Sequence, residues 1–292
     1  MQQRQASLNG NPVSAISYGA WPLSDSSPRP TEAGAIQVVH AALKGGATLI
    51  DTADAYCLEQ SEVGHNERLV AKALSQWTGA QESITIATKG GFVRPNGAWV
   101  SKADPKHLRA ACEHSLQCLE TDCIDLYQLH APDPKVPFED TIGALGELQN
   151  EGKIRYIGLS NVSVGEIKTA RSMIEVVSVQ NRLNPFFREA VSDGVVDYCD
   201  QHELVFFAYS PLGGGRLNQK LPKIAELGPI AEAHGVSNHA VVLAWVLAQG
   251  TSVVAIPAAR KVRHVLDSQS AAAIELSPEE LALIDATTFS VA

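Results

Sequence analysis

Strands and helices that alternate along the whole chain predict an α/β fold, a (β/α)8 TIM barrel. Short runs of β-branched and apolar residues recur along the 292 residues, with amphipathic stretches between them. Strands alternating with helices form a parallel sheet, and about eight strands in about 250 residues fit a closed barrel. A doubly wound sheet usually carries G-x-G-x-x-G after an early strand, and the sequence lacks it. No linker divides the chain, so we expect one domain over residues 1–292.

Each predicted barrel strand ends before an amphipathic stretch or a loop. The predicted strands are Ala15–Tyr18, Thr48–Asp51, Ile84–Lys89, Ile124–His130, Ile154–Ser160, Val176–Gln180, Val205–Tyr209 and Val253–Pro257. The predicted helices are Glu32–Lys44, Glu62–Trp77, Pro105–Leu119, Phe138–Glu151, Val164–Met173, Val191–Gln201, Ser237–Gln249 and Pro278–Thr287.

A β-hairpin is predicted ahead of the first barrel strand. Gln5–Leu8 and Val13–Ile16 read as two strands, and Asn9-Gly10 between them is a strong tight-turn signal. We expect this hairpin to close the bottom of the barrel. A frayed N-terminal tail is the alternative.

The composition is that of an ordinary soluble protein, with 45% hydrophobic residues and a formal net charge of -9. This charge argues against nucleic acid or an anionic membrane as the main partner. The N-terminus lacks the apolar segment of a signal peptide, and no apolar run is long enough to span a membrane. The five cysteines are scattered without CxxC, which favours free thiols in a reducing cytoplasm. We expect a monomer or a weak homo-oligomer.

Polar side chains stand where successive barrel strands end. Asp51, Lys89 and His130 are at the ends of three early strands, and Tyr56 lies in the loop just past Asp51. Later strand ends carry Ser160-Asn161, Gln180-Asn181 and Tyr209. In a barrel of this kind the C-terminal ends of the strands form the active site. A carboxylate, an ammonium, an imidazole and a phenol gathered there can hold a tyrosine ready to donate a proton to a carbonyl oxygen.

Several motifs resemble those of the aldo-keto reductase superfamily, in order and over nearly the whole chain. They are IDTADAY (50–56), IATKGG (86–91), LYQLHAPDP (126–134), GKIRYIGLSN (152–161), VQN (179–181) and AYSPLGGG (208–215), and the segment 108–130 resembles a family signature. The resemblance implies reduction of an aldehyde or ketone by hydride from nicotinamide C4, with Tyr56 as the proton donor. Lys89 would lower the pKa of Tyr56. Asp51 would fix Lys89, and His130 would orient the carbonyl oxygen.

The same resemblance implies that NADPH binds across the barrel mouth. Ser160, Asn161 and Gln180 would hydrogen-bond the nicotinamide amide, and Tyr209 would stack beneath its ring. The pyrophosphate would lie along a loop containing Ser210, Leu212, Gly213 and Gly214, since glycines let backbone N–H groups approach an anion. The basic residues after the last strand, Arg260, Lys261 and Arg263, would hold the adenosine 2′-phosphate. A solvated helix end is the other interpretation of this basic run.

That last segment departs from the family pattern. The family more often ends this helix in Glu-Asn, where this chain has Asp267 and Ser268, and position 264 is His where many members have Arg. Cys57 stands where the family most often has glycine, either as a reactive thiol or as packing.

Loop residues are expected to form the substrate pocket. Trp21, Phe92 and Trp99 are the main candidates, with Phe186 and Phe187 as further ones. The short segment after the last helix suggests an open pocket for small or aromatic carbonyl compounds. Aldehyde detoxification is the role that this suggests.

Other interpretations of individual residues remain open. Asp54 is a less favoured alternative to Asp51 as the functional carboxylate, because loop acids are usually solvated. Cys112, His114 and Cys118 match no zinc spacing, so we expect no metal site. Lys89 could be the Schiff-base lysine of a lyase, although a neighbouring carboxylate favours its charged form. A nicotinamide-binding regulatory subunit with little turnover is a third possibility.

Overall fold

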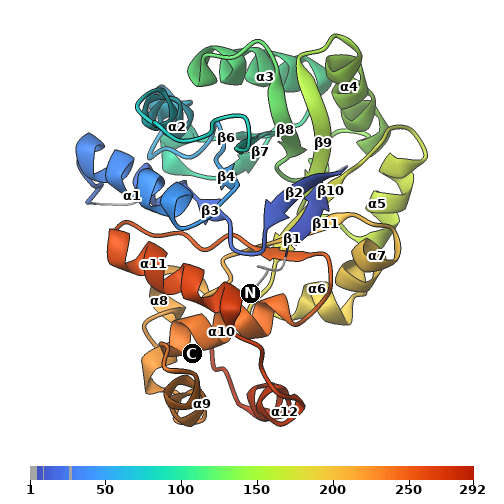
Figure 1. The fold of residues 1–292 in the computed structure, drawn as a ribbon. Helices are drawn as coiled ribbons and strands as arrows, with labels where there is room; N and C mark the ends of the chain where they lie inside the picture. The colour runs from blue at the N-terminus through green and yellow to red at the C-terminus, as the bar shows by residue number, and fades with distance from the viewer. Residues whose placement is uncertain (1–4, 9, 26–27) are drawn as a thin grey trace.

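The computed structural model describes residues 5–8, 10–25 and 28–292, and a curled parallel sheet of eight strands lies at its centre (Figure 1). The strands are β3 (Tyr18–Gly19), β4 (Leu49–Asp51), β5 (Thr85–Gly90), β8 (Ile124–Leu129), β9 (Ile154–Ser160), β10 (Ser178–Arg182), β11 (Val205–Tyr209) and β12 (Val253–Ala255). Each pairs in parallel with the next in this order.

The sheet closes between its first and last strands. Ile16 bridges Ala255 and Gly19 bridges Ala258, both in parallel. The Ser17 amide donates to the Ala255 carbonyl at 2.9 Å, so hydrogen bonding continues around the circle. The predicted (β/α)8 barrel is therefore confirmed.

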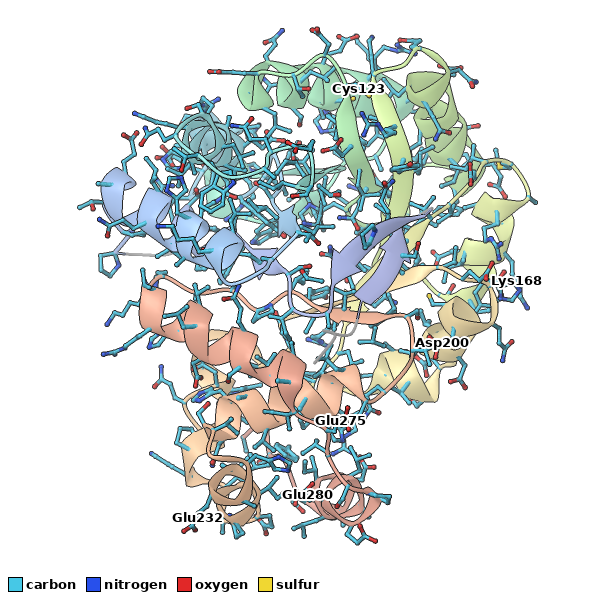
Figure 2. All side chains as sticks on the ribbon, viewed as in Figure 1. Cys123, Lys168, Asp200, Glu232, Glu275 and Glu280 are labelled. Atoms are coloured by element: carbon cyan, nitrogen blue, oxygen red, sulfur yellow. The ribbon has the colours of Figure 1, made fainter. Side chains whose placement is uncertain are left out.

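Helices surround the sheet (Figure 1). They are α1 (Glu32–Lys44), α2 (His65–Ser75), α3 (Pro105–Leu119), α4 (Phe138–Asn150), α5 (Val164–Arg171), α6 (Glu189–Ser192), α7 (Val195–Gln201), α8 (Gly214–Leu217), α9 (Leu227–His234), α10 (Asn238–Leu247), α11 (Val262–Ser270) and α12 (Pro278–Ala286). Several begin at a capping side chain, and α5 and α12 each begin with a complete capping box. Glu280, which closes the box of α12, is labelled in Figure 2 and also pairs with His234 of α9 at 2.9 Å.

The N-terminal hairpin closes the end of the barrel where the strands begin. Its strands β1 (Gln5–Leu8) and β2 (Asn11–Ser14) are antiparallel, and they cross the barrel in Figure 1. Leu8 and Val13 are buried in one apolar cluster with residues from the starts of barrel strands, among them Leu49 and Val205. This apolar plug confirms the predicted hairpin. Its second strand begins two residues earlier than we expected.

Several local features differ from the sequence-based expectation. The predicted helix Val191–Gln201 is two helices, α6 and α7, because Gly194 adopts a left-handed φ of 75° between them. Helix α9 was not predicted. The loop after β5 contains a short antiparallel ribbon, β6 (Phe92–Val93) with β7 (Val100–Ser101), and a 3-10 turn between them.

Helix ends also anchor the strand starts. Asp200, labelled in Figure 2 near the end of α7, accepts hydrogen bonds from the amides of Thr251 and Ser252 at 2.8 and 2.7 Å. These two residues directly precede β12, so the carboxylate fixes the turn that returns the chain to the barrel. No helix in the described ranges is both long and apolar enough to cross a membrane.

Truncation of the hairpin plug should destabilise the whole barrel. Leu8→Ala removes buried methyl groups that the cluster cannot refill, and we expect a loss of about 3 kcal/mol in the free energy of unfolding. Urea unfolding followed by circular dichroism measures it. Leu283→Ala is the matched control, because Leu283 is 43% exposed and should cost less than about 0.5 kcal/mol. Equal effects of the two substitutions would contradict the plug.

Candidate active site

A buried ammonium ties the central residues together. Lys89, at the end of β5, donates from Nζ to Asp51 Oδ1 at 2.7 Å, to the Thr52 carbonyl at 2.8 Å and to Tyr56 Oη at 3.0 Å. Its side chain is fully buried. The three acceptors occupy the three N–H bonds of a lysine ammonium. The structure thus brings the predicted carboxylate, ammonium and phenol into one contact group.

The carboxylate of Asp51 is held in turn by amides from across the barrel. Gln180 of β10 donates to Asp51 Oδ2 at 2.7 Å, and Gln128 of β8 lies 3.4 Å from the same oxygen. Gln128 is the register partner of Lys89, so both side chains face inward. Gly158 on the next strand leaves space for it, because a Cβ there would be 2.9 Å from Gln128 Cγ.

Gln128 is a site residue that the sequence reading missed. It precedes the strand end by two positions, and only the inward alternation of LYQLH could have singled it out.

The phenol of Tyr56 is held in its protonated form. Burial raises the pKa of Tyr56 well above its ordinary value, and the nearby negative charge of Asp51 adds to that shift. We expected Lys89 to lower this pKa; the net shift is upward instead, because desolvation of the phenolate dominates. Burial also lowers the pKa of Lys89, and Asp51 opposes that shift. A neutral phenol is the form that can give up a proton.

His130 follows β8 directly and is neutral. Burial lowers the pKa of His130 well below its ordinary value, and the charges of Lys89 and Arg94 lower it further. The ring of Phe92 is 4.7 Å from the imidazole, and the rings of Tyr56 and Trp99 are both 5.7 Å from it. Among the described residues, Nδ1 has no hydrogen-bond partner. The imidazole therefore sits in an aromatic cage beside the phenol.

Two of the five aromatic pocket candidates join this cage. Phe92 and Trp99 lie on β6 and just before β7, with their rings 5.4 Å apart, and the Trp99 ring is 6.3 Å from that of Tyr56. Trp21 begins the 3-10 turn after β3 and is 39% exposed. Phe186 instead packs edge-on to Phe289, so it belongs to another part of the surface.

Three of the four residues predicted to contact nicotinamide form a linked row beside His130, whereas the side chain of the fourth, Gln180, donates to Asp51. Asn161 donates from Nδ2 to the His130 carbonyl at 2.9 Å and to Ser160 Oγ at 3.1 Å. Tyr209 donates its hydroxyl to Asn161 Oδ1 at 2.8 Å. Asn161 has a left-handed φ of 58°, which turns its side chain back across the strand ends.

The predicted pyrophosphate loop follows β11. Ser210 has a left-handed φ of 48°, and its carbonyl accepts from Asn184 Nδ2 at 2.9 Å. Leu212 is half-buried, and Gly213 and Gly214 have φ values of 82° and 78°. Two consecutive residues in this conformation favour glycine strongly. The loop thus presents backbone with little side-chain cover.

The three predicted phosphate-binding residues cluster at the start of α11. Arg260 donates from Nη1 to the Pro28 carbonyl at 3.0 Å, Lys261 is the N-cap residue, and Arg263 lies 3.2 Å from His264 Nε2. All three are exposed, and no ion pair with a described carboxylate neutralises them.

The other candidates make no side-chain hydrogen bond to the four central residues. Asp54 is buried, whereas we expected a solvated loop acid; its carboxylate accepts from the Ala55 amide, and burial followed by the charge of Glu67 raises the pKa of Asp54. Cys57 is buried, and burial raises its pKa to about 11, so its thiol stays protonated at neutral pH. The five cysteines are free. Within the described ranges no group of three or more His, Cys, Asp or Glu side chains can hold a metal ion.

Fold and site define a barrel with a tyrosine–lysine–aspartate–histidine centre, and comparison with known proteins gives its family. The model of the Aldo/keto reductase family matches residues 15–288. The aldo-keto reductase str7 of Strobilurus tenacellus is 33% identical over 277 residues, which cover 85% of this chain and 79% of that protein. The chain belongs to the aldo/keto reductase family, whose members are oxidoreductases.

Solved structures agree with this assignment. An aldo-keto reductase of Klebsiella pneumoniae in complex with NADPH is 29% identical, with a TM-score of 0.82 over 98% of this chain and 95% of that chain. The glycerol dehydrogenase AKR11B4 of Gluconobacter oxydans is 28% identical, with a TM-score of 0.85 over 98% of this chain and 95% of that chain.

The neutral state of His130 makes a prediction about stability. In the unfolded chain a histidine has a pKa near ~6.5. As the pH falls below about 6.5, His130 binds a proton in the unfolded chain but stays neutral in the folded protein. The free energy of unfolding therefore falls by up to about 1.4 kcal/mol per pH unit. Urea unfolding of the parent and His130→Gln between pH 5 and 7.5 isolates this contribution. The parent-minus-variant difference should shrink toward pH 5, and a constant difference would refute the assignment.

Proposed function

We propose that this protein reduces aldehydes and ketones to alcohols with NADPH, and that Tyr56 is the general acid. One observation carries the proposal: Lys89 Nζ lies 2.7 Å from Asp51 and 3.0 Å from the Tyr56 hydroxyl in a buried site. A phenol that touches an ammonium loses a proton more easily as negative charge develops on its oxygen. Family membership supports the same class of reaction.

Each residue of the centre has a separate proposed role. NADPH, when bound, would supply the hydride from nicotinamide C4 that the carbonyl carbon accepts. Tyr56 donates its phenolic proton to the carbonyl oxygen, and Lys89 stabilises the phenolate that remains. Asp51 keeps Lys89 in place and charged. His130, as a neutral imidazole, donates a hydrogen bond that orients the carbonyl oxygen.

The residues of this chain fit the cofactor. Ser160 and Asn161 stand beside His130, and Gln180 lies deeper, with its amide nitrogen 2.7 Å from Asp51 Oδ2. Together they offer the donors and acceptors that a carboxamide needs. Tyr209 offers a ring fixed through its hydroxyl at the edge of the same row. A structural relative carries NADPH, which agrees with this fit. We assign the nicotinamide end to these four residues.

The remainder of the cofactor would extend away from the barrel centre. We propose that the backbone of Ser210, Leu212, Gly213 and Gly214 lies along the pyrophosphate. Arg260, Lys261 and Arg263 would bind the 2′-phosphate, since they are exposed cations without a carboxylate partner.

The alternatives are less well supported. A Schiff-base lysine reacts as a neutral amine, whereas Lys89 has three acceptors that suit an ammonium. We also propose that the chain is a single domain, that it is located in the cytoplasm, and that it is a monomer or a weak homo-oligomer. Small or aromatic carbonyl compounds remain the proposed substrates.

The role of Tyr56 can be tested by removal of one oxygen. Tyr56→Phe should lower kcat for 4-nitrobenzaldehyde by roughly a thousandfold, because general-acid catalysis contributes about 10²- to 10⁴-fold. Loss of the absorbance of NADPH on oxidation measures turnover. The Kd of NADPH, from quenching of tryptophan fluorescence, should stay within about twofold.

Two outcomes would count against the assignment. Full activity of Tyr56→Phe would remove Tyr56 from the mechanism. Tight NADPH binding by the parent without turnover of any carbonyl compound would favour the regulatory alternative.

The basic cluster predicts a preference for NADPH over NADH. Lys261→Ala with Arg263→Ala should raise the KM of NADPH about tenfold, or ~1.4 kcal/mol, and leave the KM of NADH unchanged, because only NADPH carries the 2′-phosphate. The control is Lys168→Ala with Arg171→Ala on α5, which removes the same charge elsewhere. An equal rise in both KM values would place the 2′-phosphate outside this cluster.

A further inference from the structure

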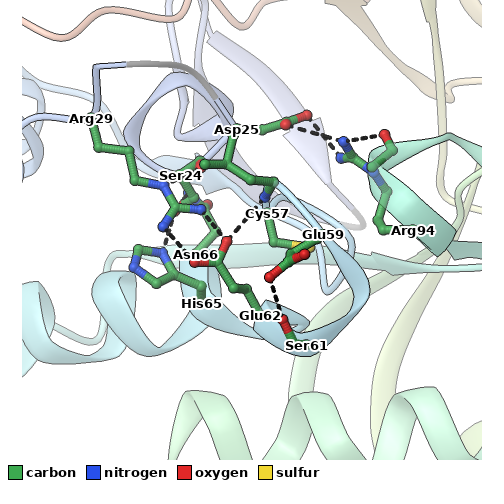
Figure 3. Close-up of polar contacts among 12 residues, drawn as sticks. Ser24, Asp25, Arg29, Cys57, Glu59, Ser61, Glu62, His65, Asn66 and Arg94 are labelled. Atoms are coloured by element: carbon green, nitrogen blue, oxygen red, sulfur yellow. Dashed lines mark hydrogen bonds and ion pairs between the residues drawn. The ribbon is translucent and has the colours of Figure 1, made fainter.

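A second buried ion pair lies at the rim of the site, among loop residues rather than in the barrel. Arg94 follows β6, is 3% exposed, and forms a two-pronged pair with Asp25 (Figure 3). Nη1 lies 2.9 Å from Asp25 Oδ2, and Nη2 lies 3.2 Å from Oδ1. Such a planar fork fixes orientation as well as distance.

The other contacts of this pair reach both loops around the phenol. Arg94 also donates from Nη1 to the carbonyl of Ala55, the residue before Tyr56, at 3.0 Å. It donates from Nη2 to the Gly97 carbonyl at 2.9 Å. All four N–H bonds of the two terminal nitrogens therefore have acceptors. The pair locks the tyrosine loop to the β6–β7 loop.

Two exposed tryptophans, Trp21 and Trp99, each contact one member of this pair. Trp21 Nε1 donates to Asp25 Oδ2 at 2.8 Å. The Arg94 guanidinium carbon lies 4.0 Å from the centre of the Trp99 ring. The carboxylate thus orients one indole and the guanidinium the other.

The rim itself is apolar. Trp21, Leu58 and Trp99 are 39%, 40% and 41% exposed. Leu58 lies beside the β6–β7 loop, since its carbonyl is 3.0 Å from the Cβ position of Gly97. Exposed apolar side chains gathered at a site mark a binding surface. Asp25 is the countercharge of Arg94, and both terminal nitrogens of Arg94 already have acceptors, so they are not available to bind an anionic substrate.

We propose that the Asp25–Arg94 pair determines substrate selectivity: it positions Trp21 and Trp99 as walls for an uncharged aromatic carbonyl compound. Asp25 and Arg94 are positioning residues, because they act through the two indoles. This inference rests on the proposed reductase function and extends it to a substrate class. A small carbonyl compound needs neither wall, whereas a flat aromatic body is held by both.

The test compares two substrates in one enzyme. The selectivity ratio is kcat/KM for 4-nitrobenzaldehyde divided by kcat/KM for methylglyoxal. Arg94→Met keeps an unbranched apolar stem but removes the guanidinium that pairs with Asp25. It should lower the ratio at least tenfold, mainly through a higher KM for the aromatic aldehyde. Arg94→Lys should recover only part of the ratio, because an ammonium cannot make the planar contacts.

A second Asp–Arg–Trp arrangement, outside this rim, supplies the matched control. Arg188 donates from Nη1 to Asp285 Oδ1 at 3.1 Å, Trp245 Nε1 donates to the same oxygen at 2.9 Å, and the Arg188 guanidinium carbon lies 4.8 Å from the centre of the Trp245 ring. Arg188→Met should therefore leave the selectivity ratio within about twofold. An equal loss in both variants, or an equal loss for both substrates in Arg94→Met, would reduce Asp25–Arg94 to a structural pair and overturn the proposal.

A milder variant covers the case in which Arg94→Met fails to fold. Trp21→Phe keeps an aromatic ring but removes the donor to Asp25, and it should lower the selectivity ratio by about threefold without a change in the unfolding midpoint. An unchanged ratio would contradict the link between the carboxylate and the wall.

Failure of the reductase function can be told apart from failure of this inference. If the parent oxidises NADPH with neither carbonyl compound, the proposed function fails. The affinity for 4-nitrobenzyl alcohol in the presence of NADP+, measured by quenching of tryptophan fluorescence, then decides the inference. Weaker binding by Arg94→Met than by the parent would support it, and equal binding would overturn it.

Discussion

The site depends on one constraint: a lysine ammonium buried inside the barrel must have its N–H bonds satisfied. An unpaired buried charge would cost several kcal/mol, so each acceptor around Lys89 is a condition of folding as well as of chemistry. Asp51 supplies the countercharge, Thr52 a carbonyl freed where β4 ends, and Tyr56 a hydroxyl. The need to satisfy the Lys89 ammonium therefore fixes the position of the Tyr56 hydroxyl.

The barrel brings residues from distant parts of the chain to the buried ammonium and its carboxylate partner. Parallel strands bring Asp51 on β4 and Lys89 on β5 to the same rim, and they bring Gln128 and Gln180 from β8 and β10 to the far oxygen of the carboxylate. The apolar hairpin closes the other end. Polar groups are thus concentrated at one mouth, where the strands end and where loops can vary without harm to the core.

Sequence periodicity was sufficient for the barrel and for the strand-end residues, because both follow from local patterns. Tyr56 needed the family resemblance, since a loop tyrosine has no periodic signal. Gln128 was missed because it precedes a strand end. The Asp25–Arg94 pair joins residues 69 positions apart in two irregular loops, which no local pattern reports. The upward net shift in the pKa of Tyr56 was not predicted, because burial is a property of the packed fold.

That upward shift bears on how the centre would work. Before reaction, burial and Asp51 both favour a neutral phenol, so the contact between Lys89 and Tyr56 is a hydrogen bond from an ammonium to a neutral oxygen. In the proposed reaction, loss of the phenolic proton to the substrate would make the same 3.0 Å contact one between an ammonium and a phenolate in a buried site. An interaction that strengthens as charge develops lowers the barrier, whereas one of constant strength does not. A tyrosine kept neutral beside a fixed cation is therefore better suited to proton donation than one already ionised.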